Sequence, residues 1–516
     1  MKKIFKHILL AVLVISFYGC RDFEELSKNP NGPADVPPSL ILRGVMADIY
    51  ERPWSLEHRQ NQFWCCNYNY YGSNEYWTNA PFNYTTLKNV LKMEEAAKAS
   101  GDLNPYSAMA KYFKAYFFVK MTLKVGDLPM DDALLGLENT EPAYNTQKEV
   151  YQQALVWLDE ANSDLKTLIA NGNTTMQGDI YYANDLNKWR KVVNTFKLRV
   201  LISLSKKEND ADLQVKSRFA EVMNNPSEFP VMESNTDNMN YIYNGGVQLY
   251  PTNPGERGKD KGRYNMAQTY VKGLTDLNDP RVYVTCNPAK AKITGAGALE
   301  ADDFKAFVGA PSGESLDDMT TKAGSGLYSY SNQIRYYGSY IGPEPGVQMA
   351  YWELCFNIAE AINRGWITGN ANTYYQNGIK ASMSFYGITD GALINITESD
   401  NDVVLKTVTA SVTDYLAQTA VTYAGNNATG LNQILTQKYL AFFQNSGQEA
   451  YFNSRRTGVP VFDIGVGTGN SGVIPNRWLY PTDEGFYNTT NYKSALMSQF
   501  NSEVDDVDYD LWINVN

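Results

Sequence analysis

Histidine is nearly absent from this chain of 516 residues, which contains only His7 and His58. His7 lies in an N-terminal stretch that has the composition of a secretion signal. The one histidine of the remaining chain cannot build a histidine-rich zinc site, and few hydrolytic mechanisms can be assembled around it. The composition therefore suits a binding protein better than an enzyme, and it gives no reason to expect a cofactor.

Basic residues are also in deficit, because 45 Lys and Arg stand against 56 Asp and Glu, for a formal net charge of −11. Removing a 19-residue leader with Lys2, Lys3 and Lys6 leaves 42 basic residues and a charge of −14. Nucleic-acid binding depends on lysine and arginine that neutralise phosphates. We therefore expect no nucleic-acid partner for the mature chain.

Long apolar runs are missing as well, since no 18 consecutive apolar residues occur. A membrane-spanning helix needs about 20 of them, so we expect none. Residues 1–19 combine three lysines, a short apolar run and Tyr18-Gly19, which is typical of a cleaved signal peptide. The cysteine that follows predicts lipid modification of Cys20, which would anchor the mature chain by acyl groups. The alternative is a plain secreted protein with an incidental cysteine.

Only four further cysteines occur, and none of them forms a C-x-x-C pair. A disulfide between the adjacent Cys65 and Cys66 would be strained. A secreted chain of this length with so few cysteines is not a disulfide scaffold. We expect buried thiols at Cys65, Cys66, Cys286 and Cys355.

Helical patterning covers much of the chain. It is clearest at 145–171, where apolar residues recur at spacings of three and four and Thr146 with Glu149 forms a capping box. A helix at 105–124 is apolar nearly all round, so we expect it to be buried. Further helices are predicted at 186–207, 346–366, 372–386 and 430–446. The basic residues of 186–207 are expected to form a solvated or salt-bridged face.

Residues 225–345 differ in composition from the helical regions: they are rich in Gly, Pro, Asn and Tyr and contain few periodic stretches. No Pro- or Ser-rich linker separates this region from the rest. The paired helices are similar to tetratricopeptide hairpins, although no clean 34-residue repeat occurs. We therefore predict one mainly α-helical domain over 20–516, with a helical scaffold at about 40–225 and 346–516 and a loop-rich irregular lobe at about 225–345.

Two patterns typical of cofactor-binding proteins and hydrolases have little support in this sequence. Gly467, Gly469 and Gly472 match G-x-G-x-x-G, but a dinucleotide site needs that turn to open a helix. The following Val473-Ile474-Pro475 would end a helix early, so we expect no cofactor there. Carboxylates are plentiful, yet no spacing singles out the pair that a glycoside hydrolase needs, so this class stays open with little support.

The most unusual stretch is 63–84, with nine aromatic residues in 22 positions, interleaved with five asparagines. A sugar has an apolar face, which stacks on an aromatic ring, and a rim of hydroxyls, which bond to amide, carboxylate or guanidinium groups. We predict a sugar-binding platform here and expect about half of the rings to pack in the core instead. The candidate ligand-binding residues are Trp64, Tyr70, Tyr71, Asn74, Tyr76, Trp77 and Asn79.

A second aromatic group lies in Gly- and Ser-rich surroundings within the loop-rich region. Its candidate ligand-binding residues are Tyr328, Arg335 and Tyr336, with Tyr330, Tyr337 and Tyr340 beside them. Tyr241 and Tyr243 form a smaller third group.

Several motifs that are weak singly occur together along the mature chain. They include Asn29-Pro30-Asn31, Gly126-Asp127-Leu128-Pro129, Ala359-Glu360-Ala361, Arg364-Gly365-Trp366, Gln437-Lys438-Tyr439 and Arg455-Arg456-Thr457-Gly458. In this order they resemble the SusD/RagB family of surface lipoproteins from Bacteroidetes, in particular its SusD-like branch. The resemblance covers nearly all of the mature chain.

The resemblance implies tetratricopeptide-like helical hairpins that support an irregular lobe. It also implies a non-enzymatic lipoprotein, anchored in the outer membrane at the cell surface, that binds a glycan and delivers it to a SusC-like TonB-dependent transporter. The alternative is a RagB-like lipoprotein that binds peptides or glycopeptides. Ligand contacts in the family correspond in position to 63–79 and about 240–340 here, whereas we expect the Arg455-Arg456 motif to be structural.

Overall fold

The computed structural model describes residues 36–76 and 78–515. The predicted signal peptide, Cys20 and the candidate ligand residue Trp77 lie outside the described residues. Within the described ranges, no helix is both long and apolar enough to cross a bilayer.

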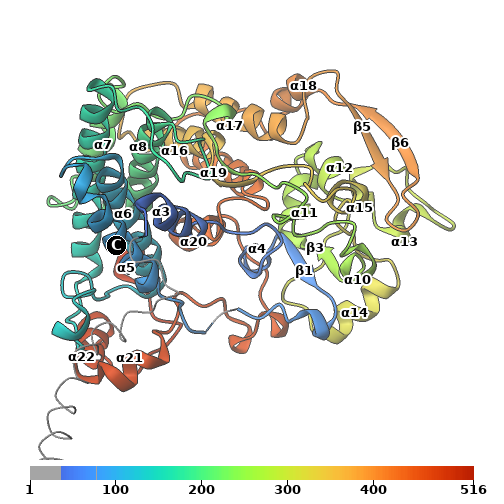
Figure 1. Cartoon of the computed structure of the whole chain (residues 1–516). Coiled ribbons are helices and arrows are strands. Elements are labelled where there is room, and N and C mark those ends of the chain that lie inside the picture. Colours follow the sequence, from blue (N-terminus) through green and yellow to red (C-terminus); the bar gives the residue numbers. More distant parts are fainter. Residues whose placement is uncertain (1–35, 77, 516) are drawn as a thin grey trace, which may run out of the picture.

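The first half of the chain forms a stack of antiparallel helices on one side of the molecule (Figure 1). Sequential neighbours pack against each other from α5 to α9, and α3 packs on α5. The predicted helices at 105–124 and 145–171 are confirmed as α6 and α7, and α6 is the buried centre of the stack. The helices are α3 (Pro38–Ala47), α5 (Tyr84–Ala97), α6 (Pro105–Val125), α7 (Gln147–Ala170), α8 (Leu186–Ser203) and α9 (Val215–Asn224).

Local signals explain where these helices begin. At the start of α7, the Glu149 backbone N–H donates to the Thr146 hydroxyl, and the Thr146 backbone N–H donates to the Glu149 carboxylate at 2.7 Å. At the start of α6, the Asn104 side chain accepts from the N–H groups of Tyr106 and Ser107. Both arrangements satisfy backbone donors that the helix itself leaves free.

A second helical group from the C-terminal third packs on the first. Its centre is α16, which contacts α17, α19 and also α8 of the first group. The helices predicted at 346–366, 372–386 and 430–446 are present, the first of them after a short strand. The group consists of α16 (Tyr351–Asn363), α17 (Ala371–Phe385), α19 (Ala428–Ala441) and α20 (Glu449–Thr457). The last two helices, α21 (Thr482–Tyr487) and α22 (Thr489–Phe500), lie apart from it at the lower end of the first stack (Figure 1).

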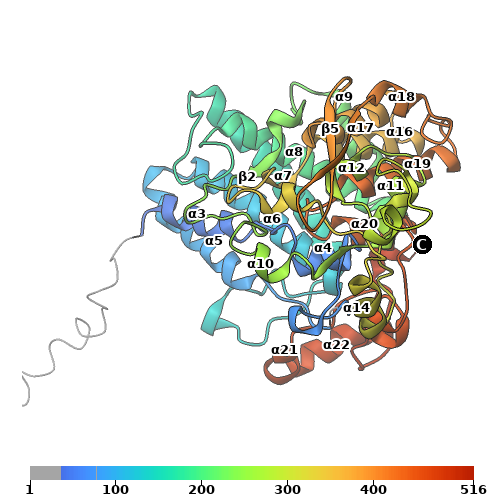
Figure 2. The same cartoon turned by 90° about the vertical axis from the view of Figure 1, so that its right-hand side faces the viewer.

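The other side of the molecule is an irregular lobe of short elements (Figure 2). The described strands form three separate antiparallel pairs, β1–β3, β2–β4 and β5–β6. The pairs β1–β3 and β5–β6 belong to the lobe, whereas β2–β4 contacts the scaffold through α8 and through Tyr50, just after α3. The strands are β1 (Trp64–Cys66), β2 (Met239–Tyr241), β3 (Tyr264–Met266), β4 (Gly346–Met349), β5 (Leu393–Thr397) and β6 (Val404–Thr409). The short helices are α4 (Leu56–Gln60), α10 (Arg257–Asp260), α11 (Gln268–Thr275), α12 (Arg281–Thr285), α13 (Lys290–Ile293), α14 (Leu316–Gly324), α15 (Gln333–Tyr337) and α18 (Val412–Ala417).

In the lobe, segments that are far apart in the sequence pack against each other. In the pair β1–β3, Trp64 lies opposite Met266 and Cys66 opposite Tyr264. The aromatic-rich segment after Phe63 is therefore part of the lobe, although it precedes the loop-rich region by more than 150 residues. The four cysteines among the described residues are free and buried, as expected.

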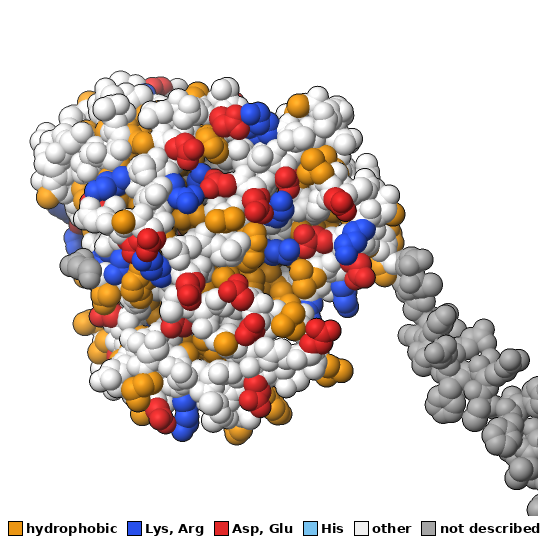
Figure 3. All heavy atoms as spheres, turned by 90° about the vertical axis from the view of Figure 1, so that its left-hand side faces the viewer, with side chains coloured by type: hydrophobic (Ala, Val, Ile, Leu, Met, Phe, Trp, Pro, Cys, Tyr) orange, Lys and Arg blue, Asp and Glu red, His pale blue; other side chains and the backbone are white. Residues whose placement is uncertain are grey.

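The basic residues of α8 face carboxylates and not solvent alone. Lys191 lies 3.0 Å from Asp237, Arg199 pairs with Glu353 at 2.5 Å, and Lys197 pairs with Asp159. On the face of the scaffold drawn in Figure 3, basic and acidic side chains are interspersed and not gathered by sign. The solvated or salt-bridged face predicted for 186–207 is thus found in part: Lys191 and the buried Lys197 and Arg199 form ion pairs. The other two basic side chains of α8, Lys188 and Arg190, donate to backbone carbonyls and to Asn162.

The Arg-Arg-Thr-Gly motif at the end of α20 joins the helical groups internally. Arg456 forms a two-point ion pair with the buried Glu360 of α16, 2.5 and 2.9 Å apart. Arg455 donates to the backbone carbonyls of Leu123 and Asn476 at 2.7 and 2.8 Å. Although burial alone would raise it, the positive charge of Arg456 holds the pKa of Glu360 at about 2. The predicted structural role of this motif agrees with these contacts.

Replacing Glu360 by Gln is expected to cost about 3–5 kcal/mol of unfolding free energy, because it leaves the buried Arg456 without its counter-charge. Urea denaturation measures this loss. The ion-pair contribution is present above about pH 4.5 and is lost as the pH falls towards 2, so the loss in the variant should shrink over that range.

The matched control is Lys272→Met, which removes an exposed ion pair with Asp276 on α11. Exposed pairs of this kind contribute about 0.5 kcal/mol or less. Equally small effects of the two substitutions would contradict a structural role for the buried pair.

Candidate functional site

A surface groove with a volume of about 400 Å³ opens in the irregular lobe. It lies between the aromatic-rich segment, the chain before and within α10, and the start of β3. Its volume is in the range of ligand pockets in proteins. The lining residues are Arg52, Tyr71, Leu249, Tyr250, Pro251, Asn253, Glu256, Asp260 and Tyr264.

The aromatic side of the groove is a chain of touching rings. The Tyr264 ring packs on Trp64 at 4.4 Å between centroids, and Tyr71 meets Tyr264 edge-on at 6.4 Å. Tyr70 continues the chain 5.2 Å from Tyr71 and is 82% exposed. The Tyr71 hydroxyl donates to the Lys259 carbonyl at 2.5 Å, which ties the aromatic segment to α10.

A short 3-10 turn, Asn69–Tyr71, presents these two tyrosines, and Gly72 ends it. Gly72 has φ +117°, and a Cβ there would lie 2.8 Å from Nη1 of Arg59. Glycine is therefore favoured by the backbone conformation, and a larger residue would also displace the Arg59 guanidinium. The Arg59 guanidinium in turn lies 5.3 Å from the Trp64 ring, so the turn is supported from beneath.

The polar side of the groove offers a guanidinium and two carboxyl groups. Arg52 is exposed and forms no ion pair with any residue that the structure describes. Glu256 accepts from the Lys259 ammonium at 3.0 and 3.1 Å. Asp260 is only 8% exposed, and its Oδ1 atom has no hydrogen-bond partner among the described residues. Burial, together with the nearby charge of Glu256, raises the pKa of the Asp260 carboxyl.

The structure places the predicted residues of the aromatic segment in two sets. Tyr71 lines the groove, and Tyr70 lies beside it in contact with solvent. Trp64 is 3% exposed in β1, and Asn74 and Tyr76 are also buried. These three side chains therefore present no surface to a ligand in this conformation.

Each buried member has a structural reason for its position. The Asn74 side chain accepts from the Cys66 N–H at 2.8 Å and donates to the Cys66 carbonyl at 2.9 Å, so it closes the loop after β1. The Tyr76 hydroxyl donates to the Gln60 carbonyl at 2.6 Å. Asn79 is exposed, but its amide donates to the Tyr480 carbonyl, and it pairs with Leu479 and not with the groove.

The second predicted group lies mostly in the interior as well. Tyr328 is buried and donates its hydroxyl to Glu314 at 2.6 Å. Arg335 is held by Glu344, with Nε 2.8 Å from the carboxylate. Tyr336 packs edge-on against Trp54, 4.8 Å between centroids. Tyr340 is the exposed member of this group.

Sequence reasoning did not single out most of the groove residues. Arg52 lies before the aromatic segment, and Glu256, Asp260 and Tyr264 lie nearly 200 residues after it. Their proximity results from the pairing of β1 with β3, for which the sequence carries no local signal. For this region the sequence indicated only its Gly-, Pro-, Asn- and Tyr-rich composition and the position of ligand contacts in the family, at about 240–340.

Two other surface hollows are larger but chemically less suited to a sugar. One of about 610 Å³ lies between α17 and α18, and one of about 620 Å³ lies along α22. Neither has an aromatic ring in its lining. A sugar face would therefore find no stacking surface there.

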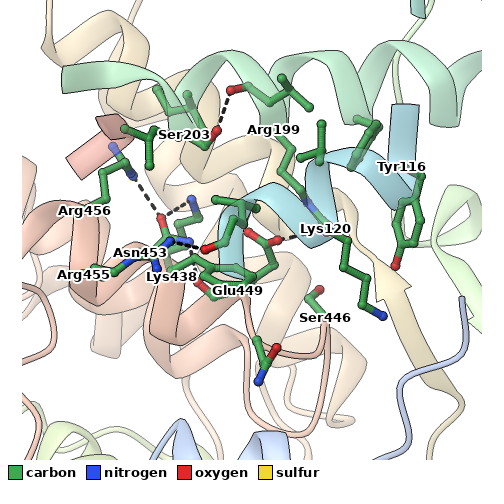
Figure 4. Close-up of a pocket in the computed structure, with 18 of the residues that line it drawn as sticks. Tyr116, Lys120, Arg199, Ser203, Lys438, Ser446, Glu449, Asn453, Arg455 and Arg456 are labelled. Atoms are coloured by element: carbon green, nitrogen blue, oxygen red, sulfur yellow. Dashed lines mark hydrogen bonds and ion pairs between the residues drawn. The ribbon is translucent and has the colours of Figure 1, made fainter. Parts of the chain in front are cut away.

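A narrower cavity of about 50 Å³ lies inside the scaffold between α6, α8 and α20. Figure 4 shows Lys120, Arg199, Lys438 and Glu449 among its lining side chains. Its volume suits a few water molecules and not a sugar ring. Burial raises the pKa of Glu449 to about 7 and lowers the pKa of Lys438 to about 8.

Comparison with known proteins identifies the architecture. A family model described as SusD-like, starch-binding associating with outer membrane, matches residues 35–481. No curated protein sequence matches the chain.

Solved structures match over almost the whole chain. A SusD homolog from Bacteroides fragilis is 32% identical with a TM-score of 0.81, and the match covers 93% of this chain and 100% of that one. A second SusD homolog from the same species is 28% identical with a TM-score of 0.77, over 93% and 100%. A chitin-binding SusD homolog from Flavobacterium johnsoniae is 20% identical with a TM-score of 0.68, over 93% and 98%, and shows the shared fold alone. The predicted mainly helical fold with an irregular lobe is confirmed.

Glu449→Gln tests the charges of the internal cavity. The ordinary pKa of this carboxyl is 4.5 and burial raises it to about 7, so its contribution to stability is complete below pH 4.5 and is lost as the pH rises through 7. The unfolding free energy of the variant should therefore increase relative to wild type between pH 4.5 and 8, on the order of 1.4 kcal/mol per unit of pKa difference.

Chemical denaturation at several pH values measures this trend. Glu138→Gln, in the exposed 3-10 turn Gly136–Glu138, serves as the control for the general effect of removing one negative charge. A parallel course of the Glu449→Gln and wild-type curves would contradict the assignment.

Proposed function

The chain belongs to the SusD-like family of starch-binding proteins that associate with the outer membrane, and we propose that it captures oligosaccharides or polysaccharides at the cell surface and delivers them to a SusC-like TonB-dependent transporter. The resemblance found in the sequence motifs is thus confirmed at the level of the family. The capture of glycan by this chain, its transporter partner and its anchoring are proposals.

One observation carries the glycan proposal: the groove combines the half-buried rings of Tyr71 and Tyr264 with a guanidinium and two carboxyl groups, and the exposed Tyr70 lies beside it. Tyr70 and Tyr71 offer ring faces and edges for the apolar side of a sugar. Arg52 can donate to hydroxyl oxygens, and Asp260 can accept from hydroxyl protons. Stacking on one ring and a few such bonds support an affinity in the micromolar to millimolar range. Weak binding suits a carrier that must release its cargo.

Two alternatives share the scaffold and are distinguished by the ligand. A peptide- or glycopeptide-binding role would use the same rings for side chains, and a panel of oligopeptides beside the glycans separates it from the proposal. A hydrolytic role would use two carboxylates as acid and base and would release reducing ends from polysaccharide. Glu256 is engaged by Lys259, which favours binding over proton transfer.

We propose that lipidated Cys20 holds the protein at the membrane. The chain enters its first described helix, α3, at Pro38, 18 residues after this cysteine. A segment of this length lets the folded domain stand off the lipid surface.

Tyr70→Ala is expected to weaken glycan binding about 5–30-fold, because the loss of one stacked ring costs on the order of 1–2 kcal/mol. Isothermal titration against a panel of neutral oligosaccharides measures this. Since Tyr70 is 82% exposed, the melting temperature should stay unchanged. Tyr487→Ala is the matched control, because this tyrosine is 74% exposed on α21, outside the groove. Equal affinities of the two variants would remove the tyrosine platform from the proposal.

Cys20→Ala is expected to release the protein from the membrane fraction, because acylation at this position would be lost. Fractionation of cells that lack the proposed transporter and express tagged wild type or variant measures this, because binding to the transporter would also retain the variant. Retention of the variant in membranes would contradict the lipid anchor.

A further inference from the structure

We propose that the groove is one part of a longer glycan-binding surface, and that the ring of Tyr340 at its border binds a later sugar unit of the same chain. The protein then selects glycans by length, because only a chain that reaches Tyr340 makes both contacts. This inference rests on the proposed function of the groove as a glycan site. It adds chain length, and a residue outside the groove, to that function.

The first observation is the position of Tyr340 next to the groove. The backbone N–H of Tyr250, which lines the groove, donates to the Tyr340 carbonyl at 2.8 Å. A Cβ on Gly255 would lie 3.7 Å from both Cε1 and the hydroxyl oxygen of Tyr340. Gly255 itself lies between Asn253 and Glu256, which also line the groove. The Tyr340 ring therefore borders the groove at the turn that leads into α10.

The second observation is that the backbone around Tyr340 is held in place by a groove residue. Gly342 has φ +69°, and a Cβ there would lie 2.2 Å from Cδ2 of Tyr250. Glycine alone combines this conformation with so close an approach to a ring. The Ile341 N–H also donates to the Ser339 hydroxyl at 3.2 Å. Because this loop is packed on Tyr250 before a ligand arrives, little backbone entropy is lost when a ligand contacts Tyr340.

The third observation is that the Tyr340 side chain is accessible. It is 45% exposed, and its hydroxyl forms no hydrogen bond with any residue that the structure describes. Tyr328, Tyr336 and Tyr337 of the same aromatic group are buried. A phenol ring offers an apolar surface to the face of a sugar, and a free hydroxyl can both donate to and accept from sugar hydroxyls. Tyr340 therefore has the properties of a sugar-stacking residue.

The fourth observation is the separation of Tyr340 from Tyr71, the ring already placed in the groove. The Tyr71 hydroxyl donates to the Lys259 carbonyl within α10, whereas Tyr340 contacts Gly255, before that helix begins. Even in helical form, the four residues between these two contacts rise about 6 Å along the axis. The two tyrosines therefore meet this wall of the groove at different ends. A sugar unit stacked on Tyr71 leaves Tyr340 free for a later unit.

Length selection follows from the covalent connection between sugar units. A unit bound in the groove holds the next units of its chain near Tyr340 at a high effective concentration. The second contact then forms without a second loss of translational freedom. A chain too short to reach from the groove to Tyr340 gains nothing from that ring.

Isothermal titration with the dimer and the hexamer of five neutral glycans tests the inference. The glycans are α-1,4-glucan, β-1,4-glucan, β-1,4-mannan, β-1,4-xylan and the β-1,4-linked polymer of N-acetylglucosamine. For the glycan that wild type binds most tightly, Tyr340→Ala is expected to weaken the hexamer about 5–10-fold and the dimer less than about twofold. A hexamer can also bind in more registers than a dimer, but this statistical gain is the same in wild type and variant. Tyr340→Phe, which retains the ring, should bind the hexamer within about twofold of wild type.

Ile341→Ala is the matched control, because Ile341 is 53% exposed next to Tyr340 but carries no ring. It is expected to leave the hexamer affinity within about twofold of wild type, since a sugar face stacks on a ring. Both side chains are exposed, so unchanged melting temperatures should show that each variant folds.

Three outcomes overturn the inference: Tyr340→Ala weakens dimer and hexamer equally, it weakens neither, or Ile341→Ala weakens the hexamer as much as Tyr340→Ala does. The last of these would indicate a general apolar contact surface, as a protein partner would use. Binding of any probe in these cases leaves the proposed function standing. Failure of every probe to bind wild type removes the proposed function and the inference together.

Discussion

The pairing of two three-residue strands, β1 and β3, is the contact on which the candidate site depends. It joins segments about 200 residues apart and sets Cys66 opposite Tyr264. Side chains reinforce it, since Asn67 donates to Asn265 at 2.6 Å at the next position along the chain. The strand pair alone is too short to be stable in water, so the packing around it must hold it. Without this pairing, Tyr71 and Tyr264 would not line the same groove.

The scaffold supplies that support through buried arginines with fixed partners. Arg199 joins α8 to α16, and Arg456 joins α20 to α16. Because a guanidinium presents several donors in a rigid plane, it fixes the orientation of two elements and not only their distance. Ion pairs of this kind contribute less to net stability than to the choice of one arrangement, in keeping with a fold whose many short elements have little helical or sheet cooperativity of their own.

The sequence predicted the scaffold well because its signals are local. Thr146 with Glu149, and the apolar stripe that follows, specify α7 without reference to any other segment. The positions of the site residues could not be predicted from local signals in this way. Trp64, Tyr70 and Tyr76 are alike in composition and lie within thirteen residues, yet one is on the surface and two are in the core. Which side each ring takes depends on where β1 ends and on the 3-10 turn at Asn69, and both depend on β3. Aromatic density therefore located the segment but could not separate its buried from its exposed members.

The buried side chains of this segment support the exposed rings from beneath. Trp64 lies under Tyr264 and against Arg59, and Asn74 closes the loop that carries Tyr70 and Tyr71. A tyrosine held in this way has already lost most of its freedom before a ligand arrives, so little further entropy is lost on binding. The same rigidity would limit how closely the rings can follow the proposed sugar ligand, so we expect few contacts and fast release. Core packing beneath the groove and the weak, reversible binding that we propose above it are thus two consequences of one arrangement.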